Sequence, residues 1–250
     1  IRLLSLDENG AVKVTNPYAS AGIVITSRLP YSGDIDGDNK EETISTSTDA
    51  QGLTVLNVES SGSTAEAATG IKEVSSIRLF DLDGDGVREI YIDGKDANAD
   101  TITCVAFYSP DESQPLHLAL FDSQSYAHGS IKEFADSKLI LDTEMNILGT
   151  YKVKNVYALA DKSFSKASDD IVFDNNMTYV TTSKSITLSN GSLLATGTKL
   201  RFTSTDGSSV INFVTDGGFT GSIPIASSGS GWTISGQPDT SYFTSLPYKN

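Results

Sequence analysis

Asp81-Leu82-Asp83-Gly84-Asp85-Gly86-Val87-Arg88-Glu89-Ile90 is the stretch that best predicts both the fold and the chemistry of this chain. An earlier stretch, Asp34-Ile35-Asp36-Gly37-Asp38-Asn39-Lys40-Glu41-Glu42-Thr43-Ile44, repeats its pattern. Both contain the spacing D-x-D-G-D-x-x-x-E, and each runs into residues that alternate between apolar and polar. Because such alternation is typical of half-buried strands, we expect each acidic loop to lead directly into a β-strand.

The acidic spacing has a chemical reason. Carboxylates at loop positions one, three and five converge on one point if the chain wraps tightly, and the glycine at position four permits that wrap. A backbone carbonyl at position seven and the glutamate at position nine complete a cage of oxygens, which calcium binds at about 2.3–2.6 Å. We therefore predict two calcium ions. The expected ligands are Asp34, Asp36, Asp38, Lys40 and Glu42 in the first loop, and Asp81, Asp83, Asp85, Val87 and Glu89 in the second.

Other metals and other loop types fit the pattern less well. Magnesium demands a tight octahedron and keeps its waters. Zinc favours Cys and His, which neither loop contains. An EF-hand places a glutamate at position twelve, where these loops have Ser45 and Ile92. The alternative interpretation, a pair of solvated acidic turns, is weakened by the shared register of the two copies.

The composition favours a folded, acidic protein. The 250 residues carry a formal net charge of −14, and 38% of them are hydrophobic. Nucleic acid is therefore a poor partner, because no basic stripe is present to displace counterions. No run approaches the roughly 20 apolar residues that a membrane helix needs. The chain opens with Ile1 rather than Met, which fits a leader that was removed or left out.

Short alternating runs separated by Gly, Asn, Asp and Ser predict a mainly β protein. The pairs Asn190-Gly191, Asp206-Gly207 and Asp216-Gly217 favour hairpin turns in the last third. A helical turn or two is expected only within residues 130–141. The expected strands lie at residues 23–25, 53–58, 77–80, 89–92, 102–107, 185–188, 198–203, 210–214 and 222–225.

The polar segment 161–170 predicts a domain boundary between about residues 160 and 176. We therefore expect one β domain at residues 1–165 that carries both acidic loops. A second, smaller β domain is expected at residues 176–250.

The acidic loops resemble those of FG-GAP and VCBS repeats, the calcium loops of integrin-type β-propellers and related bacterial surface proteins. The resemblance implies a propeller-like or sandwich β domain, with metal ligation by the Asp and Glu side chains named above. A closed propeller typically needs about four to eight blades. Only two copies keep the acidic triplet here, while residues 6–10 and 120–123 read as worn copies. A partial propeller, a sandwich and a chain trimmed at its N-terminus all stay open.

Residues from about 178 to 248 resemble bacterial SH3-like (SH3b) domains. The resemblance rests on the order of strands and turns and on Gly218-Phe219-Thr220-Gly221-Ser222-Ile223, where Ser222 replaces the usual Trp of a Gly-x-x-Gly-Trp-Val signature. It implies a small SH3-like β-barrel with an aromatic-lined groove for peptides or cell-wall stem peptides. The candidate groove residues are Trp232, Tyr242, Phe243 and Tyr248; the alternative is that they fill the core.

No catalytic constellation stands out in the sequence. His117 lies in an alternating run, His128 stands beside Gly129 as in a turn, and Cys104 lies in a predicted strand. A nucleophile elbow, a zinc-protease helix and a phosphate-binding glycine loop are all absent from the sequence. Cys104 is the single cysteine, so no internal disulfide forms, which fits a secreted protein of a Gram-positive bacterium.

We therefore expect a secreted or cell-surface calcium-binding protein that is not an enzyme. Its expected partners are cell-wall peptides or surface proteins and glycans, and the calcium is expected to be structural. The alternative is a secreted hydrolase acting on cell wall or glycan, or a non-catalytic fragment of one, because a glycosidase needs only two facing carboxylates.

Overall fold

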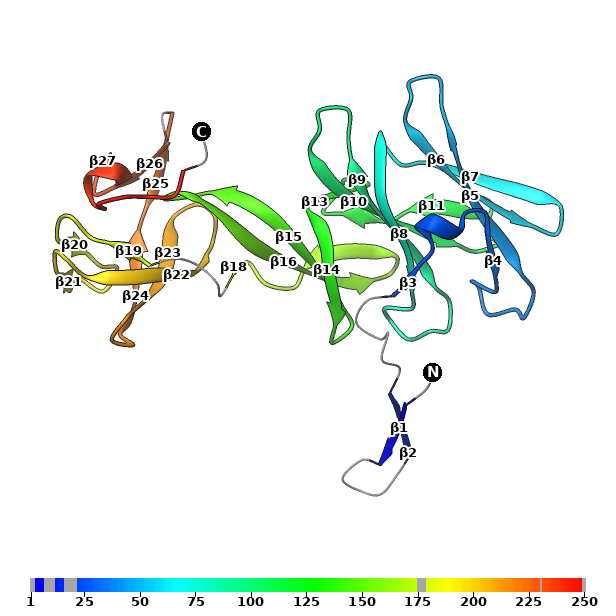
Figure 1. Cartoon of the computed structure of the whole chain (residues 1–250), viewed down its shortest axis with the longest axis horizontal. Coiled ribbons are helices and arrows are strands. Elements are labelled where there is room, and N and C mark those ends of the chain that lie inside the picture. Colours follow the sequence, from blue (N-terminus) through cyan, green and yellow to red (C-terminus); the bar gives the residue numbers. More distant parts are fainter. Residues whose placement is uncertain (1–2, 7–11, 16–21, 175–178, 230, 249–250) are drawn as a thin grey trace. The chain divides into compact units, whose positions relative to one another are not determined.

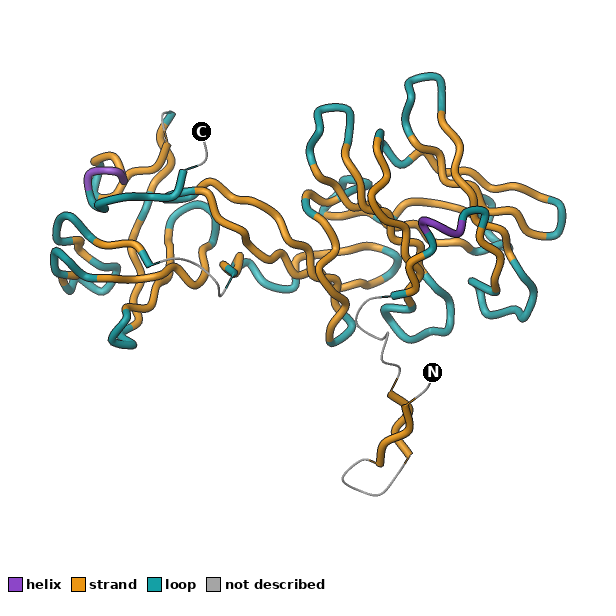
Figure 2. Tube along the Cα trace, viewed as in Figure 1, coloured by secondary structure: helices purple, strands orange, loops and turns teal. Residues whose placement is uncertain are grey.

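The computed structural model describes residues 3–6, 12–15, 22–174, 179–229 and 231–248. In that part of the chain, twenty-seven strands are joined by loops, and two short 3-10 helices are the only helical elements (Figures 1 and 2). The prediction of a mainly β protein is therefore confirmed. Within these residues, no helix has both the length and the apolar character needed to cross a membrane.

The chain packs as two compact units. The first consists of residues 1–141 and 157–167, and the second of residues 142–156 and 168–250. Strands β15 (Lys138–Asn146) and β16 (Thr150–Ala160) contribute residues to both units. The predicted domains at 1–165 and 176–250 remain predictions; the packing differs from them in grouping residues 142–156 with the C-terminal unit.

The first unit holds two main sheets in the order β4-β5-β6-β7 and β11-β10-β9-β8-β3, with β13 paired to β10. A separate hairpin pairs β1 with β2, and β12 pairs in parallel with β17. The elements are β1 (Leu3–Leu6), β2 (Val12–Thr15), β3 (Ile23–Val24), η1 (Thr26–Arg28), β4 (Tyr31–Gly33), β5 (Glu42–Thr48), β6 (Thr54–Ser60), β7 (Ser63–Ala68), β8 (Glu73–Phe80), β9 (Glu89–Lys95), β10 (Thr101–Tyr108), β11 (Leu116–Leu118), β12 (Leu120–Phe121), β13 (Ala127–His128), β14 (Ser130–Ala135) and β17 (Ser163–Lys166).

Strands β9 and β10 are covered on both faces. Successive side chains of a strand point to opposite faces, and these two strands bury almost every residue. Ile92 and Cys104 pack into one hydrophobic cluster with Ile44 and Val58 of β5 and β6. Tyr91 packs into a second cluster on the opposite face. The second acidic loop therefore leads into the most enclosed strand pair of the unit.

The prediction of a helical turn or two within residues 130–141 is wrong. Strands β14 and β15 form a hairpin there, and its turn is made by Asp136 and Ser137 at φ 51° and 55°. Phe134, Leu139 and Leu141 are buried in the cluster around Tyr91. Packing against this cluster decides the conformation, because two positive-φ residues suit a tight hairpin turn and not a helix.

The second unit contains the sheet path β16-β18-β22-β23-β24, with β19 paired to β22, plus the small sheets β20-β21 and β25-β26-β27. In the part of the unit that the structure describes, none of these sheets closes into a barrel, so the SH3-like barrel stays a prediction. The elements are β18 (Ile171–Phe173), β19 (Val180–Thr181), β20 (Ile186–Thr187), β21 (Leu193–Leu194), β22 (Lys199–Thr205), β23 (Val210–Thr215), β24 (Thr220–Pro224), β25 (Ala226–Ser228), β26 (Gly231–Ile234), β27 (Gln237–Pro238) and η2 (Asp239–Ser241).

The three predicted hairpin turns of this unit are confirmed. Asn190-Gly191 joins β20 to β21, Asp206-Gly207 joins β22 to β23, and Asp216-Gly217 joins β23 to β24, each as an antiparallel pair. The sheets enclose a core that includes Phe173, Phe202 and Phe213. Of the two proposed worn copies of the acidic loop, residues 7–10 lie outside the described residues, and Leu120–Phe121 forms β12.

Candidate metal centres

Both acidic loops connect antiparallel strands in the first unit. The first joins β4 to β5, and the second joins β8 to β9. The glutamate at position nine is in each case the first residue of the following strand: Glu42 pairs with Gly33, and Glu89 pairs with Phe80. The expectation that each loop leads directly into a strand is confirmed.

The two loops fold with the same internal hydrogen bonds. The Asp side chain at position one accepts hydrogen bonds from the backbone amides of positions four and six. The Asp at position three accepts one from the amide of position five, and the Asp at position five accepts one from the amide of position seven. Position four is Gly37 or Gly84, at φ 83° and 80°, a conformation that favours glycine. For the Asp at position one, the two nitrogen–oxygen distances are 2.8 and 3.2 Å in the first loop and 2.7 and 3.1 Å in the second. For the Asp at position three the distance is 3.1 Å in the first loop and 3.3 Å in the second, and for the Asp at position five it is 2.7 Å and 2.8 Å.

A buried glutamate lies beneath each loop. Glu42 is 0% exposed and Glu89 is 2% exposed. Each accepts a hydrogen bond from the amide at position two, Ile35 at 2.9 Å and Leu82 at 3.0 Å. Burial raises the pKa of Glu42 and raises that of Glu89 to about 7, and nearby aspartates add to both shifts. A divalent cation would offset the cost of holding these carboxylates ionised.

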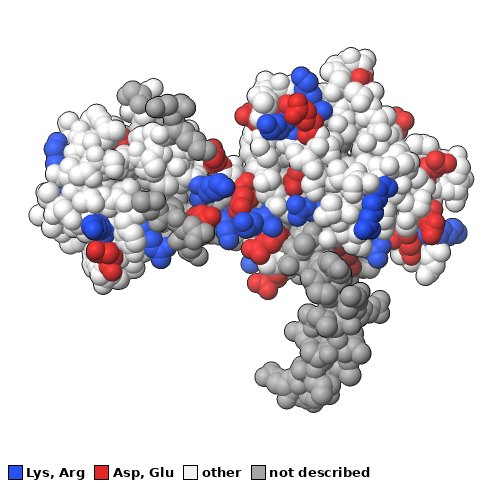
Figure 3. Space-filling model, viewed as in Figure 1, with Lys and Arg blue, Asp and Glu red and all other residues white. Residues whose placement is uncertain are grey.

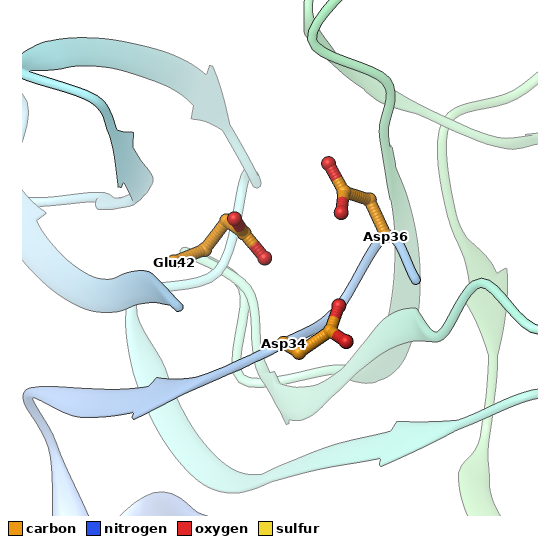
Figure 4. A group of neighbouring side chains, drawn as sticks. All are labelled: Asp34, Asp36 and Glu42. Carbon is orange, nitrogen blue, oxygen red and sulfur yellow. The ribbon is translucent and has the colours of Figure 1, made fainter. Parts of the chain in front are cut away.

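Carboxylate oxygens converge in both loops. One oxygen each from Asp34, Asp36 and Glu42 lies within 4.8 Å of the others, and these side chains point toward one another (Figure 4). Asp36 Oδ2 is buried and has no hydrogen-bond partner among the described residues. Two oxygens bound to one calcium can lie at most about 5 Å apart, so the spacing fits a shared calcium ion.

The second loop groups a different set of oxygens. Here Asp81, Asp83 and Asp85 place one oxygen each within 4.8 Å of the others. The group does not include Glu89, whose Oε2 accepts a hydrogen bond from the Tyr91 hydroxyl at 3.0 Å. Tyr91 was not anticipated from the sequence, although its place two residues beyond the loop glutamate is a usable signal, since i and i+2 share a face in a strand.

In the first loop, the group of converging carboxylates does not include Asp38. Lys40 Nζ lies 2.7 Å from Asp38 Oδ2. The second loop has Val87 where the first has Lys40, so Asp85 has no such cation beside it. The two groups therefore differ at two places: Asp38 is paired with Lys40 in the first loop, and Glu89 is hydrogen-bonded to Tyr91 in the second. The structure thus brings together six of the eight predicted carboxylates, three in each loop.

The two loops contact each other. The Arg88 amide donates to the Ile35 carbonyl at 2.7 Å, and Arg88 Nη1 donates to the Asp34 carbonyl at 2.7 Å. A Cβ built on Gly37 would lie 3.4 Å from the Gly86 carbonyl oxygen. Sequence reasoning missed Arg88, because the first loop has Glu41 at the same position and the repeat therefore carries no signal for it.

The first loop borders a groove of about 700 Å³. Asp36, Asp38 and Lys40 line one side, and Tyr108 and Asp111 lie among its other residues. On the visible face of the molecule, acidic and basic side chains are interspersed and no broad basic patch is seen (Figure 3). The groove itself is lined by carboxylates and by Lys40, so a ligand there would meet both signs of charge.

The residues considered for catalysis, Cys104, His117 and His128, are buried or packed against aromatic rings. Cys104 is 0% exposed, and burial raises the pKa of its thiol to about 12, which makes it a poor nucleophile. His117 lies in β11, as the alternating pattern predicts, and stacks on Phe107 with ring centres 5.7 Å apart. The His128 ring meets Tyr126 edge-on.

The four aromatic candidates of the second unit differ in their burial and in their contact with a groove. Phe243 is 3% exposed and packs edge-on against Phe202 in the core. Tyr242 packs partly against the same core, with Lys184 Nζ 5.8 Å from its ring centre. Trp232 also packs partly against this core, and it lines a groove of about 520 Å³ together with Tyr248. Phe243 is therefore a core residue, whereas Trp232 and Tyr248 stay candidate groove residues.

No protein-family model, curated protein or solved structure matches this chain. Its function is therefore inferred from the geometry of its sites.

Proposed function

We propose that this chain is a calcium-binding β protein in which two ions occupy the duplicated acidic loops of the first unit. The observation that carries the proposal is the repetition of the same hydrogen bonds, together with converging carboxylates and a buried glutamate, at two places in the unit. Solvated acidic turns have no reason to bury Glu42 and Glu89. A shared cation supplies that reason, because a buried carboxylate needs a partner.

The donor set supports calcium in particular. Every predicted ligand is an oxygen, and both groups contain three converging carboxylates. Calcium accepts six to eight oxygens in a flexible geometry, so backbone carbonyls of Lys40 and Val87 and water can complete the shell. Ligand distances near 2.4 Å are expected in the bound state.

We assign the ions a structural role. Glu42 and Glu89 are both ligand candidates and the first residues of β5 and β9. An ion that fixes either glutamate therefore also fixes the start of the strand. Extracellular modules bind calcium at about 10⁻⁴–10⁻³ M, which fits a secreted or cell-surface protein of a Gram-positive bacterium.

The resemblances noted above complete the proposal. They suggest an FG-GAP or VCBS-like domain that holds the calcium, followed by an SH3-like domain that binds a cell-wall peptide or a surface protein or glycan. The hydrolase alternative is less well supported. In the groove beside the first loop, Asp36 and Asp38 belong to the proposed calcium site, which leaves Asp111 as its remaining carboxylate.

Calorimetry tests the calcium proposal. Chelated and dialysed protein titrated with calcium should bind two ions, and Asp36→Ala or Asp83→Ala should each remove one. Asp96→Ala is a matched control, because Asp96 accepts amide hydrogen bonds from Asn98 and Asp100 within a turn but lies outside both acidic groups. Absence of binding at millimolar calcium would refute the proposal.

A further inference from the structure

The groove of the second unit contains a buried carboxylate with no cationic partner. Asp239, the first residue of η2, is 5% exposed. Its Oδ1 accepts a hydrogen bond from the Thr240 amide at 2.7 Å, and its Oδ2 accepts one from the Tyr248 hydroxyl. Among the described residues, no Lys, Arg or His lies within 4 Å of these oxygens. Buried charges are normally paired with an opposite charge, whereas both hydrogen-bond donors to this carboxylate are neutral.

Two aromatic rings line the same groove. The Trp232 ring is held in place because its Nε1 donates to the Asn146 carbonyl at 2.8 Å. Tyr248 is 40% exposed, although its hydroxyl donates a hydrogen bond to the Asp239 carboxylate. Hydroxyl groups of β25 and β26 also line the groove. The groove of about 520 Å³ is lined by these residues, with Ser227, Ser228, Thr233 and Thr240 among the others.

We propose that this groove binds a primary alkylammonium group, as carried by a lysine side chain of a peptide. The ammonium would pair with Asp239, and its alkyl stem would lie along Trp232 and Tyr248, which also attract a cation through their ring faces. An acidic ligand would be repelled by Asp239. A purely apolar ligand would leave the carboxylate both buried and unpaired.

This inference deepens the ligand-binding part of the proposed function and does not depend on the calcium part. The calcium loops belong to the first unit, whereas every residue lining the groove belongs to the second. Calcium calorimetry on the same samples therefore reports separately on the two proposals, and either can fail while the other stands.

Trp232 is the only tryptophan of the chain, so fluorescence excited selectively at tryptophan reports on this groove. The full chain is titrated with acetyl-Gly-Lys-Gly-amide and, as the matched probe, with the same peptide carrying norleucine for lysine. We expect saturable quenching or a spectral shift with the lysine peptide, and binding at least about tenfold weaker with norleucine. Equal responses to the two peptides, or no response to either, would overturn the proposal without reference to any variant.

Variants then test the carboxylate itself. Asp239→Asn keeps the shape and one oxygen to accept from the Thr240 amide, while its NH2 group can donate to the Tyr248 hydroxyl. It removes the charge and should weaken lysine-peptide binding about tenfold or more. Asp216→Asn removes an exposed carboxylate from the β23–β24 turn of the same unit and should leave binding unchanged. Circular dichroism confirms that each variant is folded. A folded Asp239→Asn protein that binds as tightly as the unmodified chain would contradict the assignment.

Discussion

Arg88 Nη1 of the second acidic loop donates a hydrogen bond to the Asp34 carbonyl of the first loop at 2.7 Å. The backbone amide of Arg88 also donates to the neighbouring Ile35 carbonyl. Arg88 thus links the two candidate calcium sites by two hydrogen bonds. These bonds add to the hydrophobic packing between the sheet β4-β5-β6-β7 and the sheet containing β8 and β9.

Arg88→Met should lower the free energy of unfolding by about 1–3 kcal/mol, because the Asp34 carbonyl loses a charged donor. The contact joins two protein groups, so the loss should be similar in calcium and in chelator. Urea unfolding measures it. Arg28→Met is the control, since Arg28 is exposed in η1, and its effect should stay within about 0.5 kcal/mol.

Asp83→Ala should lower the melting temperature in calcium and have much less effect in chelator, where the site is empty in both proteins. At a tenfold excess of calcium over the dissociation constant, one ion stabilises the folded state by about 1.4 kcal/mol. Scanning calorimetry with and without calcium measures this. An equal shift under both conditions would mean that the loop serves as an ordinary turn.

The stability of the chelated protein should fall as pH rises from about 4.5 to about 7. Burial raises the pKa of Glu89 from 4.5 to about 7 in the folded state. In that window the folded state holds a proton that the unfolded state has lost, so unfolding becomes easier with rising pH, by at most about 3 kcal/mol. Urea unfolding at several pH values measures the slope.

Two comparisons isolate Glu89 in that experiment. Glu89→Gln removes the titrating group and keeps acceptors for Leu82 and Tyr91, so its unfolding free energy should depend less on pH. Calcium should also flatten the profile of the unmodified protein between about pH 4.5 and about 7, because the ion stabilises the charged form of Glu89. A Glu89→Gln profile that matches the unmodified one in chelator would rule out this explanation.

Lys40→Met should tighten calcium binding at the first loop about threefold, because it frees Asp38 Oδ2 and removes a cation from beside the site. Titration calorimetry would show the change at one of the two sites. Lys72→Met is the control, since Lys72 lies outside the loop, between β7 and β8. Weaker or unchanged binding in Lys40→Met would show that Asp38 is not a ligand of the first ion.

The sequence by itself was enough to predict the acidic loops, the strands that follow them and the hairpin turns of the last third. The loops were predictable because positions one to nine are close along the chain. Their hydrogen bonds therefore depend on local spacing and on the conformations open to Gly37 and Gly84. The hairpin turns are equally local, since two residues such as Asn190-Gly191 select the turn.

Only the tertiary structure decided which groups those loops meet. Arg88 reaches Asp34 across 54 positions of sequence. The pairs Lys40–Asp38 and Tyr91–Glu89, by contrast, lie only two residues apart. The hairpin within residues 130–141 depends on burial against the Tyr91 cluster. The groove depends on Asp239 meeting Tyr248 and Trp232. Such contacts arise from the packing of sheets, which brings together residues whose separation along the chain carries no pattern.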